Sequence, residues 1–112
     1  MKLARIVRQL QLDVLTAEDK LDVAVESGYT SDLLSDVMAN SKENDVWVTL
    51  QTHHNIIAVA KLKELAGIIL VNNRQPQEET KKKAAEEGVP LLMTADSAFE
   101  ISGKLYRILK EE

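Results

Sequence analysis

A regular alternation of apolar runs and helical patterns after residue 45 is the feature that most constrains the fold. Residues 46–50 form an apolar run, which breaks into the polar segment 51–55 before a helical pattern over residues 55–65. Residues 68–71 are apolar at every position, as in a strand covered on both faces. Strands that alternate with helices through short connections predict right-handed crossovers and a parallel sheet. The expected fold is therefore a three-layer α/β domain with a mainly parallel sheet.

The remaining segments add elements to this sheet. A helix is predicted over residues 3–10, and two half-buried strands over residues 10–14 and 21–25, where apolar and polar residues alternate. These two strands are expected toward one margin of the sheet. Further helices are predicted over residues 31–40, from Pro76 to about residue 87, and from Ser97 onward, with a last strand over residues 89–93. No linker or internal repeat interrupts the pattern, so residues 1–112 are expected to form one domain.

Several single residues have structural predictions of their own. Gly67 follows a predicted helix and suits the left-handed residue at a helix C-terminus, and Gly88 is predicted to end the helix that begins at Pro76. Ser97 and Glu100 have the spacing of a capping box. Gly103 lies inside the last predicted helix, where glycine costs about 1 kcal/mol relative to alanine. Its backbone is therefore expected to pack closely on another part of the structure.

Composition restricts the classes of function. The 112 residues include no cysteine, which excludes disulfides, thiolate metal sites and a cysteine nucleophile. The formal net charge of −4 argues against general binding to nucleic acid or to an anionic membrane. No uncharged apolar stretch approaches the roughly 20 residues of a membrane helix, and the first residues lack the apolar core of a signal peptide. A cytoplasmic protein is expected, with neither nucleic acid nor a membrane as its partner.

Polar residues follow several of the predicted strands. Open α/β sheets bind ligands at the carboxyl ends of their strands, where helix N–H groups also favour anions. Turn formation and helix capping favour the same residue types, so structural roles are the alternative reading. The combination of Gln51, His53 and Arg74 favours a pocket, because ordinary caps do not require it. The candidate ligand-binding residues are Ser27, Gly28, Tyr29, Ser31, Gln51, Thr52, His53, Asn55, Asn72, Asn73, Arg74, Thr94 and Ser97.

No catalytic or metal-binding set is apparent from the residue spacing. His53 and His54 lie at a predicted helix start, where the helix dipole disfavours a positive charge, but adjacent side chains are expected to point apart. No acidic cluster lies at metal-ligand spacing. Asp32 and Asp36 are interpreted as a solvated helix face, with Asp32 in the first turn. Trp47 is predicted to be core or a subunit contact, with stacking on a ligand as the alternative. Neither an enzymatic activity nor a metal or cofactor is predicted.

Three blocks of the sequence resemble a known family. They are residues 28–40, beginning Gly-Tyr-Thr-Ser-Asp, residues 45–53, Asp-Val-Trp-Val-Thr-Leu-Gln-Thr-His, and residues 69–76, Ile-Leu-Val-Asn-Asn-Arg-Gln-Pro. In this order they resemble a DRTGG domain over nearly the whole chain. In the segment that names the family, Asp22 and Gly28 match the motif, whereas Val23, Glu26 and Ser27 replace its arginine, threonine and first glycine.

The resemblance implies a fold and a kind of function. This family is similar to the N-terminal domain of HPr kinase/phosphorylases, and it occurs fused to phosphotransacetylases and to pyrophosphatases with CBS domains, or as free-standing proteins. It implies an accessory or regulatory α/β module that tends to pair with itself. It does not imply a kinase activity, because the chain has no Gly-x-x-x-x-Gly-Lys-Ser/Thr phosphate loop.

Three functions are compatible with these observations. The first is a non-catalytic, homodimeric regulatory module that senses a small metabolite, an adenine nucleotide being one candidate. The second is a structural adaptor that docks on a partner enzyme. The third is a small enzyme or phosphotransfer accessory acting through His53, Asp32 or Ser35, for which metal and cationic clamps would be needed.

Overall fold

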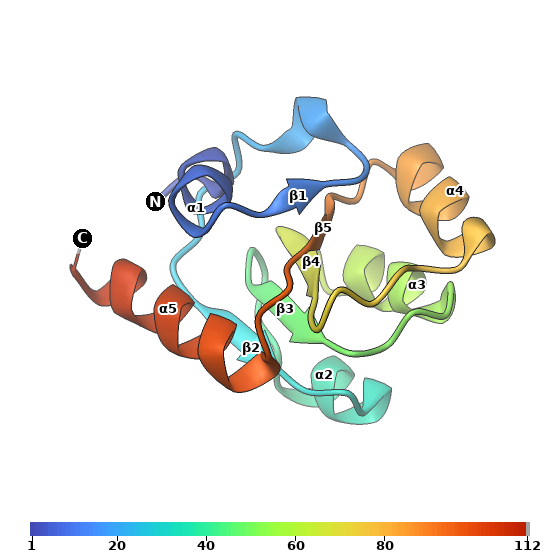
Figure 1. Cartoon of the computed structure of the whole chain (residues 1–112). Helices are drawn as coiled ribbons and strands as arrows, with labels where there is room; N and C mark the ends of the chain where they lie inside the picture. The colour runs from blue at the N-terminus through green and yellow to red at the C-terminus, as the bar shows by residue number, and fades with distance from the viewer. Residues whose placement is uncertain (112) are drawn as a thin grey trace.

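A five-stranded sheet lies between two layers of helices (Figure 1). The computed structural model describes residues 1–111. The sheet has the order β1-β5-β4-β3-β2. Strands β2 to β5 are parallel to their neighbours, and β1 pairs with β5 in the antiparallel direction. The predicted mainly parallel sheet is confirmed. Its strands are β1 (Asp13–Val14), β2 (Gly28–Thr30), β3 (Val46–Thr49), β4 (Gly67–Leu70) and β5 (Leu91–Met93).

Helices cover both faces of the sheet, which confirms the three-layer architecture. On one face pack α1 (Leu3–Leu10) and α5 (Ala98–Glu111). On the other face pack α2 (Leu34–Asn40), α3 (Asn55–Leu62) and α4 (Glu78–Glu87). A short 3-10 helix, η1 (Glu18–Lys20), follows β1. Within residues 1–111, no helix combines the length and the apolar character that crossing a membrane requires.

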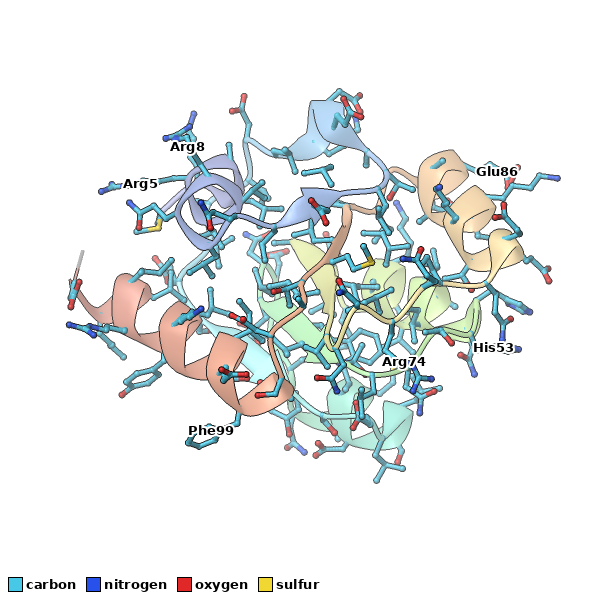
Figure 2. The ribbon with its side chains drawn as sticks, viewed as in Figure 1. Arg5, Arg8, His53, Arg74, Glu86 and Phe99 are labelled. Atoms are coloured by element: carbon cyan, nitrogen blue, oxygen red, sulfur yellow. The ribbon has the colours of Figure 1, made fainter. Side chains whose placement is uncertain are left out.

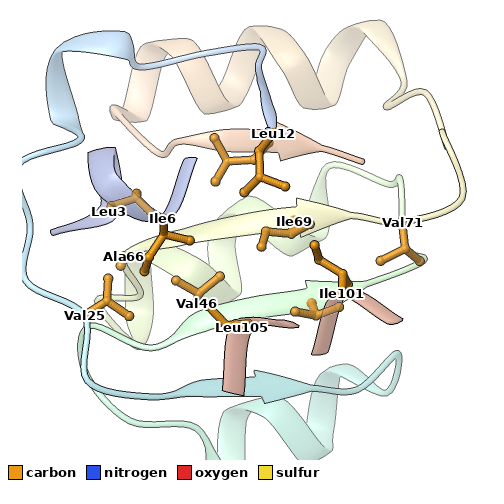
Figure 3. Close-up of a cluster of buried hydrophobic side chains, with 12 residues drawn as sticks. Leu3, Ile6, Leu12, Val25, Val46, Ala66, Ile69, Val71, Ile101 and Leu105 are labelled. Atoms are coloured by element: carbon orange, nitrogen blue, oxygen red, sulfur yellow. The ribbon is translucent and has the colours of Figure 1, made fainter. Parts of the chain in front are cut away.

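Two hydrophobic cores follow from the alternation of side chains along the central strands. Val46 and Val48 of β3 join Ile69 of β4 in the cluster beneath α1 and α5, which is seen in Figure 3. Trp47 faces the opposite way and packs with Ile68 beneath α2, α3 and α4. Every residue of β3 and β4 is buried, as expected for strands covered on both faces. Trp47 is fully buried, which confirms it as a core residue.

The N-terminal segment differs from the prediction of two strands at one margin. β1 lies at the margin beside β5, but residues 21–25 are not a strand of the sheet. They pair with the start of the chain instead. The Leu3 amide donates to the Val23 carbonyl at 3.0 Å, and the Val25 amide donates to the Met1 carbonyl at 2.7 Å. This local pairing accounts for the alternating pattern and leaves Val25 buried in the core.

The opposite margin is formed by β2, where the sequence pattern predicts a turn and the start of a helix. Residues 28–30 run parallel to β3, so α2 begins at Leu34 and Asp32 precedes its first turn. A Cβ added at Gly28 would lie 2.9 Å from Leu105 Cδ2 and 3.1 Å from the Val46 carbonyl oxygen. Glycine at this position therefore permits the close approach of α5 to the edge strand.

The other glycine predictions have mixed outcomes. Gly67 lies in β4, where an added Cβ would lie 3.1 Å from the Pro90 carbonyl oxygen, so a close approach explains this glycine. The left-handed residue after α3 is Glu64, with φ 54°. The predicted close packing of Gly103 is wrong, because an added Cβ would meet nothing within 4 Å. Gly88 ends α4 as predicted, and it has the left-handed conformation, with φ 68°.

Candidate functional site

The carboxyl ends of four strands meet at one edge of the sheet, because β2, β3, β4 and β5 are parallel. The loops that leave this edge comprise residues 31–33, 50–54, 71–77 and 94–97. We call this region the carboxyl edge. Ten of the predicted site residues lie here, which is the arrangement that the parallel sheet predicts: Ser31, Gln51, Thr52, His53, Asn55, Asn72, Asn73, Arg74, Thr94 and Ser97.

Three of the predicted site residues do not share this edge. Ser27 and Gly28 lie at the amino end of β2, at the edge of the sheet opposite the carboxyl edge. There the Ser27 hydroxyl donates to the buried Asp45 carboxylate. Tyr29 lies within β2, and its hydroxyl donates to the Asp36 carboxylate at 2.8 Å. The error has one cause: residues 28–30 form a strand, so the chain reaches the carboxyl edge only after them.

Asp32 ties the ends of β2 and β3 together. Its carboxylate accepts hydrogen bonds from the Thr49 hydroxyl at 2.8 Å and from the Leu50 amide at 2.7 Å. Its carbonyl accepts a hydrogen bond from the Gln51 side-chain amide at 2.9 Å. Asp32 is exposed and lies near the start of α2, but it precedes the helix, so the predicted helix face shared with Asp36 is wrong. Gln51, one of the predicted site residues, is used to position this loop.

Asp36 is also held by neighbouring donors. Hydrogen bonds from Ser31, Tyr29 and Asn40 hold the pKa of the Asp36 carboxyl below its ordinary value. The hydrogen bond to Asp36 in turn raises the pKa of Tyr29. The Trp47 indole N–H donates to the Ser31 carbonyl at 2.8 Å and fixes the end of β2 from beneath. The two aspartates of the predicted helix face are thus separate structural anchors.

The loops after β4 and β5 are joined by backbone hydrogen bonds. Asn72 and Asn73 have φ angles of 56° and 54°, a left-handed conformation that asparagine adopts more readily than most residues. Their amides donate to the carbonyls of Asp96 at 2.9 Å and Thr94 at 2.8 Å. The Thr94 hydroxyl accepts a hydrogen bond from the Asp96 amide at 3.2 Å. Turn formation alone therefore explains these residue types.

Carboxylates already stand at the amino ends of three helices near the carboxyl edge. The predicted capping box of α5 is confirmed, since the Glu100 amide donates to Ser97 Oγ at 3.2 Å and the Ser97 amide donates to the Glu100 carboxylate at 3.1 Å. Glu78 and Glu79 lie in the first turn of α4, and Asp36 lies in the first turn of α2. These side chains complement the positive ends of the three helix dipoles.

The amino end of α3 has no such carboxylate, since its first turn contains no acidic residue. The Asn55 amide donates to His53 Nδ1 at 3.1 Å. The rings of His53 and His54 lie 4.1 Å apart between centroids at an interplanar angle of 32°, so they stack and do not point apart as predicted. His54 Nε2 lies 3.7 Å from the Glu79 carboxylate. The positive end of this dipole is thus balanced by no carboxylate of its own turn.

Arg74 adds an exposed cation to the same part of the edge. Its loop is attached to the His53 loop, because the Thr52 carbonyl accepts hydrogen bonds from the Gln77 amide at 3.3 Å and the Thr80 hydroxyl at 2.7 Å. Figure 2 shows Arg74 and His53 on the same side of the molecule. Among residues 1–111, no carboxylate forms an ion pair with Arg74.

A hollow of about 300 Å³ runs between α3 and α4 and borders the carboxyl edge. Lys61 and Lys83 lie in its wall, together with His54 and Asn55 from the amino end of α3, and Glu87 is the carboxylate of this lining. We call it the α3–α4 hollow. Within the described chain, residues 1–111, no group of three His, Asp or Glu side chains is placed to hold a metal ion. The arrangement offers cationic and N–H groups, which suit the binding of an anion.

The two lysines of this hollow, Lys61 and Lys83, are not among the site residues predicted from the sequence. Lys83 belongs to a run of three lysines that the helical pattern predicts to be solvated, and Lys61 lies in a helix with an apolar face. Only the packing of α3 against α4 places them in one wall. The run of three lysines was the signal for a cationic site in the sequence. The direction in which each lysine side chain points depends on tertiary structure, so the sequence did not show which lysine lines the hollow.

A family model for the DRTGG domain matches residues 5–108 of the chain. The chain belongs to the DRTGG domain family. Among solved structures, this DRTGG domain is similar to the CBS and DRTGG domains of the regulatory region of Clostridium perfringens pyrophosphatase, complexed with the activator diadenosine tetraphosphate. The TM-score is 0.72 and the sequence identity 14%. A comparison with curated proteins gave no match.

The structural match covers 93% of this DRTGG domain and 45% of the pyrophosphatase chain. The domain therefore spans less than half of that regulatory region. At this level of identity the likeness concerns the fold. The resemblance inferred from the three sequence blocks, and the α/β fold that it implies, are confirmed.

Proposed function

We propose that this DRTGG domain is a non-catalytic regulatory module that pairs with itself and senses an anionic small molecule, with an adenine nucleotide as the best-supported class. The observation that carries the proposal is the α3–α4 hollow, which begins at the amino end of α3, a helix with no carboxylate in its own first turn. The regulatory region to which the domain is similar was solved with a dinucleotide activator, which supports the choice of ligand class.

Electrostatics favours this position over the other helix ends. A phosphate group at the amino end of α3 would meet the positive end of a dipole together with His54, Lys61 and Lys83. The same group at the amino end of α4 would face Glu78 and Glu79 in the first turn of that helix. At α3, Glu79 lies 3.7 Å from His54 Nε2 and Glu87 lines the hollow, so Lys61 and Lys83 supply the positive charge that an anion would meet there.

The predicted site residues of the carboxyl edge remain part of this proposal as the surroundings of the ligand. Arg74 is the first choice among them for a phosphate contact, because it is exposed and has no ion pair within residues 1–111. Arginine binds phosphate oxygens through two parallel N–H donors. Ser27, Gly28 and Tyr29 have no part in it, because they lie away from the edge.

We propose no catalysis because the candidate catalytic side chains, His53 and Asp32, make hydrogen bonds within the structure. His53 Nδ1 accepts the Asn55 amide, and the Asp32 carboxylate accepts two structural hydrogen bonds. Phosphotransfer needs cationic groups positioned around the reacting phosphate. The hydrogen bonds of His53 and Asp32 instead hold the loops of the carboxyl edge in place. Since adenine nucleotides are intracellular metabolites, the proposal includes a cytoplasmic location.

The experiment is a melting-temperature measurement with ATP and with diadenosine tetraphosphate. A ligand at about 100 times its Kd would stabilise the domain by about 2.7 kcal/mol, which corresponds to a rise on the order of 10 °C for a chain of this size. We expect Lys61→Gln combined with Lys83→Gln to remove most of the rise, and Arg74→Gln to reduce it.

The matched control is Arg8→Gln, which removes an exposed cation from α1. Figure 2 shows Arg8 on the opposite side of the molecule from Arg74 and His53. This variant should keep the full rise. The proposal fails if neither nucleotide stabilises the wild-type domain at millimolar concentration. It also fails if the lysine variant and Arg8→Gln respond equally.

A structural adaptor for a partner enzyme is the second candidate. It is favoured by the hydrogen bonds that occupy Gln51, Thr94 and Ser97, since these side chains then need no ligand. The two candidates differ in one readout. A module that is stabilised by a purified partner enzyme and by none of the nucleotides would be an adaptor.

A further inference from the structure

The outer face of α5 carries two aromatic side chains exposed to water. Phe99 is 90% exposed and Tyr106 is 66% exposed, although the chain has only four aromatic residues. Figure 2 shows Phe99 projecting away from the body of the molecule. Residues seven positions apart lie two turns apart on the same side of a helix. We call the surface formed by Phe99, Ser102, Gly103, Tyr106 and Lys110 the α5 face.

Gly103, in the middle of the α5 face, has no role inside the chain. A helix-interior glycine is unfavourable relative to alanine, and an added Cβ here would meet nothing within 4 Å. The distance between two packed helices depends on the side chains at their contact, and small side chains permit the closest approach. Together with Ser102, this glycine suits a close contact with a helix from outside the chain.

The charges of α5 make the helix complementary to an antiparallel copy of itself. Glu100 lies near its amino end, whereas Arg107 and Lys110 lie beyond Gly103. A second copy of α5, related to the first by a two-fold axis at the middle of the helix, runs antiparallel to it. The acidic end of each helix then meets the basic end of the other, so the two-fold contact contains this charge pairing twice. In the single chain, Arg107 pairs with the exposed Glu111 of its own helix at 3.1 Å. A parallel copy would place like charges together.

A hollow beside the α5 face offers a place for an exposed aromatic ring. It measures about 240 Å³, lies between α5 and the edge strand β2, and is lined by Gly28, Leu105, Tyr106 and Leu109 among others. Phe99 is two turns away from Tyr106 along the helix. An antiparallel copy centred between these two residues brings its own Phe99 to this hollow, and the first Phe99 reaches the equivalent hollow of the copy.

We propose that a second copy of this chain occupies the α5 face, in a two-fold symmetric, antiparallel α5–α5 contact centred between Phe99 and Tyr106. Each Phe99 packs against the partner's Tyr106 and enters the hollow beside it. Ser102 and Gly103 of the two copies meet near the axis. This inference deepens the self-association in the proposed function by naming its surface, and it rests on that part of the proposal.

The first test measures self-association by sedimentation velocity over a concentration series. Phe99→Asp should weaken the dimer on the order of 100-fold, because a buried aromatic anchor is lost twice in a symmetric contact. Its thermal unfolding at concentrations where all variants are monomeric should match the wild type, since Phe99 is almost fully exposed in the single chain. Leu62→Asp is the matched control, because Leu62 is 71% exposed on α3, away from this face.

The second test measures the orientation of the two helices. The chain has no cysteine, so Ser102→Cys and Lys110→Cys each introduce a single thiol, and Ser102→Cys leaves Gly103 in place. In the antiparallel contact the two copies of residue 102 lie near the axis, whereas the two copies of residue 110 lie about 22 Å apart along the helices. A short bis-maleimide cross-linker should therefore join Ser102→Cys to itself and leave Lys110→Cys mostly unjoined.

The outcomes separate this inference from the proposed function. A dimer that survives Phe99→Asp, or one that cross-links equally well at both cysteine positions, overturns the antiparallel α5 contact and leaves self-association in place. A chain that is monomeric at every concentration overturns both. The nucleotide proposal is unaffected by either result, because it is read from the melting temperature with ligand.

Discussion

Two acidic residues near the end of β2 show that the role of a side chain is predicted wrongly when the start of its helix is predicted wrongly. Asp36 lies four positions after Asp32, a spacing that suggests one helix face, but the helix begins between them at Leu34. Asp32 accepts hydrogen bonds from β3 and the loop that follows it, and Asp36 accepts hydrogen bonds from Tyr29 and Asn40. At this scale the function of a carboxylate is set by the donors that tertiary structure brings to it.

The hydrogen bonds to Asp36 predict a specific dependence of stability on pH. Because they lower the pKa of Asp36 in the folded chain below its ordinary value of 3.8, their stabilisation is fully present above that pH and is lost as the pH falls through the folded pKa. The difference in free energy of unfolding between the wild type and Asp36→Asn should therefore be constant near neutral pH and shrink below about pH 3.8.

The measurement is urea denaturation followed by the fluorescence of Trp47, the only tryptophan of the chain and a buried residue. Asp13→Asn, at an exposed position on β1, is the control for the loss of a carboxylate outside this network. A difference for Asp36→Asn that grows on acidification would contradict the assignment of Asp36 as an ionised anchor.

At the scale of elements, α5 and α4 present two glycines with opposite expected behaviour. Gly103→Ala should stabilise the domain by about 1 kcal/mol, because the helix gains propensity and the added Cβ meets nothing within 4 Å. Gly88→Ala should destabilise it by about 1 kcal/mol or more, because φ is 68° at this helix end. Chemical denaturation of both variants in a Phe99→Asp background removes any contribution from self-association. The same sign for both substitutions would contradict this explanation.

Strong local patterns made some elements predictable. The apolar runs of β3 and β4 are continuous because both faces of these strands are buried. The capping box at Ser97 and the left-handed Gly88 depend on neighbours within a few residues, so their chemistry is visible in the sequence. These features allowed the succession of strands and helices along the chain after residue 45 to be predicted. That succession in turn predicts which loops lie at the carboxyl edge.

The edge elements were not predictable in the same way. β2 has only three residues with a mostly exposed pattern, so no hydrophobic period marks it as a strand. Residues 21–25 have the period of a strand but pair with the start of the chain. The α3–α4 hollow and the hollow beside Tyr106 depend on how helices pack, which local sequence does not record. The sequence therefore predicted which residues gather at the carboxyl edge, but not that Lys61 and Lys83 lie in one wall of the α3–α4 hollow.

On the scale of the whole molecule, the two proposed surfaces lie on different layers. The α3–α4 hollow is formed by helices that cover one face of the sheet, and α5 covers the other face. Figure 1 shows α5 on the side of the sheet away from α3 and α4. The two proposed sites therefore do not compete for the same surface.

The most direct test of ligand sensing is the mapping of amide chemical shifts in the 112-residue chain during titration with diadenosine tetraphosphate. We predict that the shifts concentrate at residues 53–58 and 72–75 and around Lys61 and Lys83, while residues 98–110 change little. The absence of shifts at millimolar ligand, or shifts that concentrate on α5 and leave α3 unchanged, would contradict the proposed site.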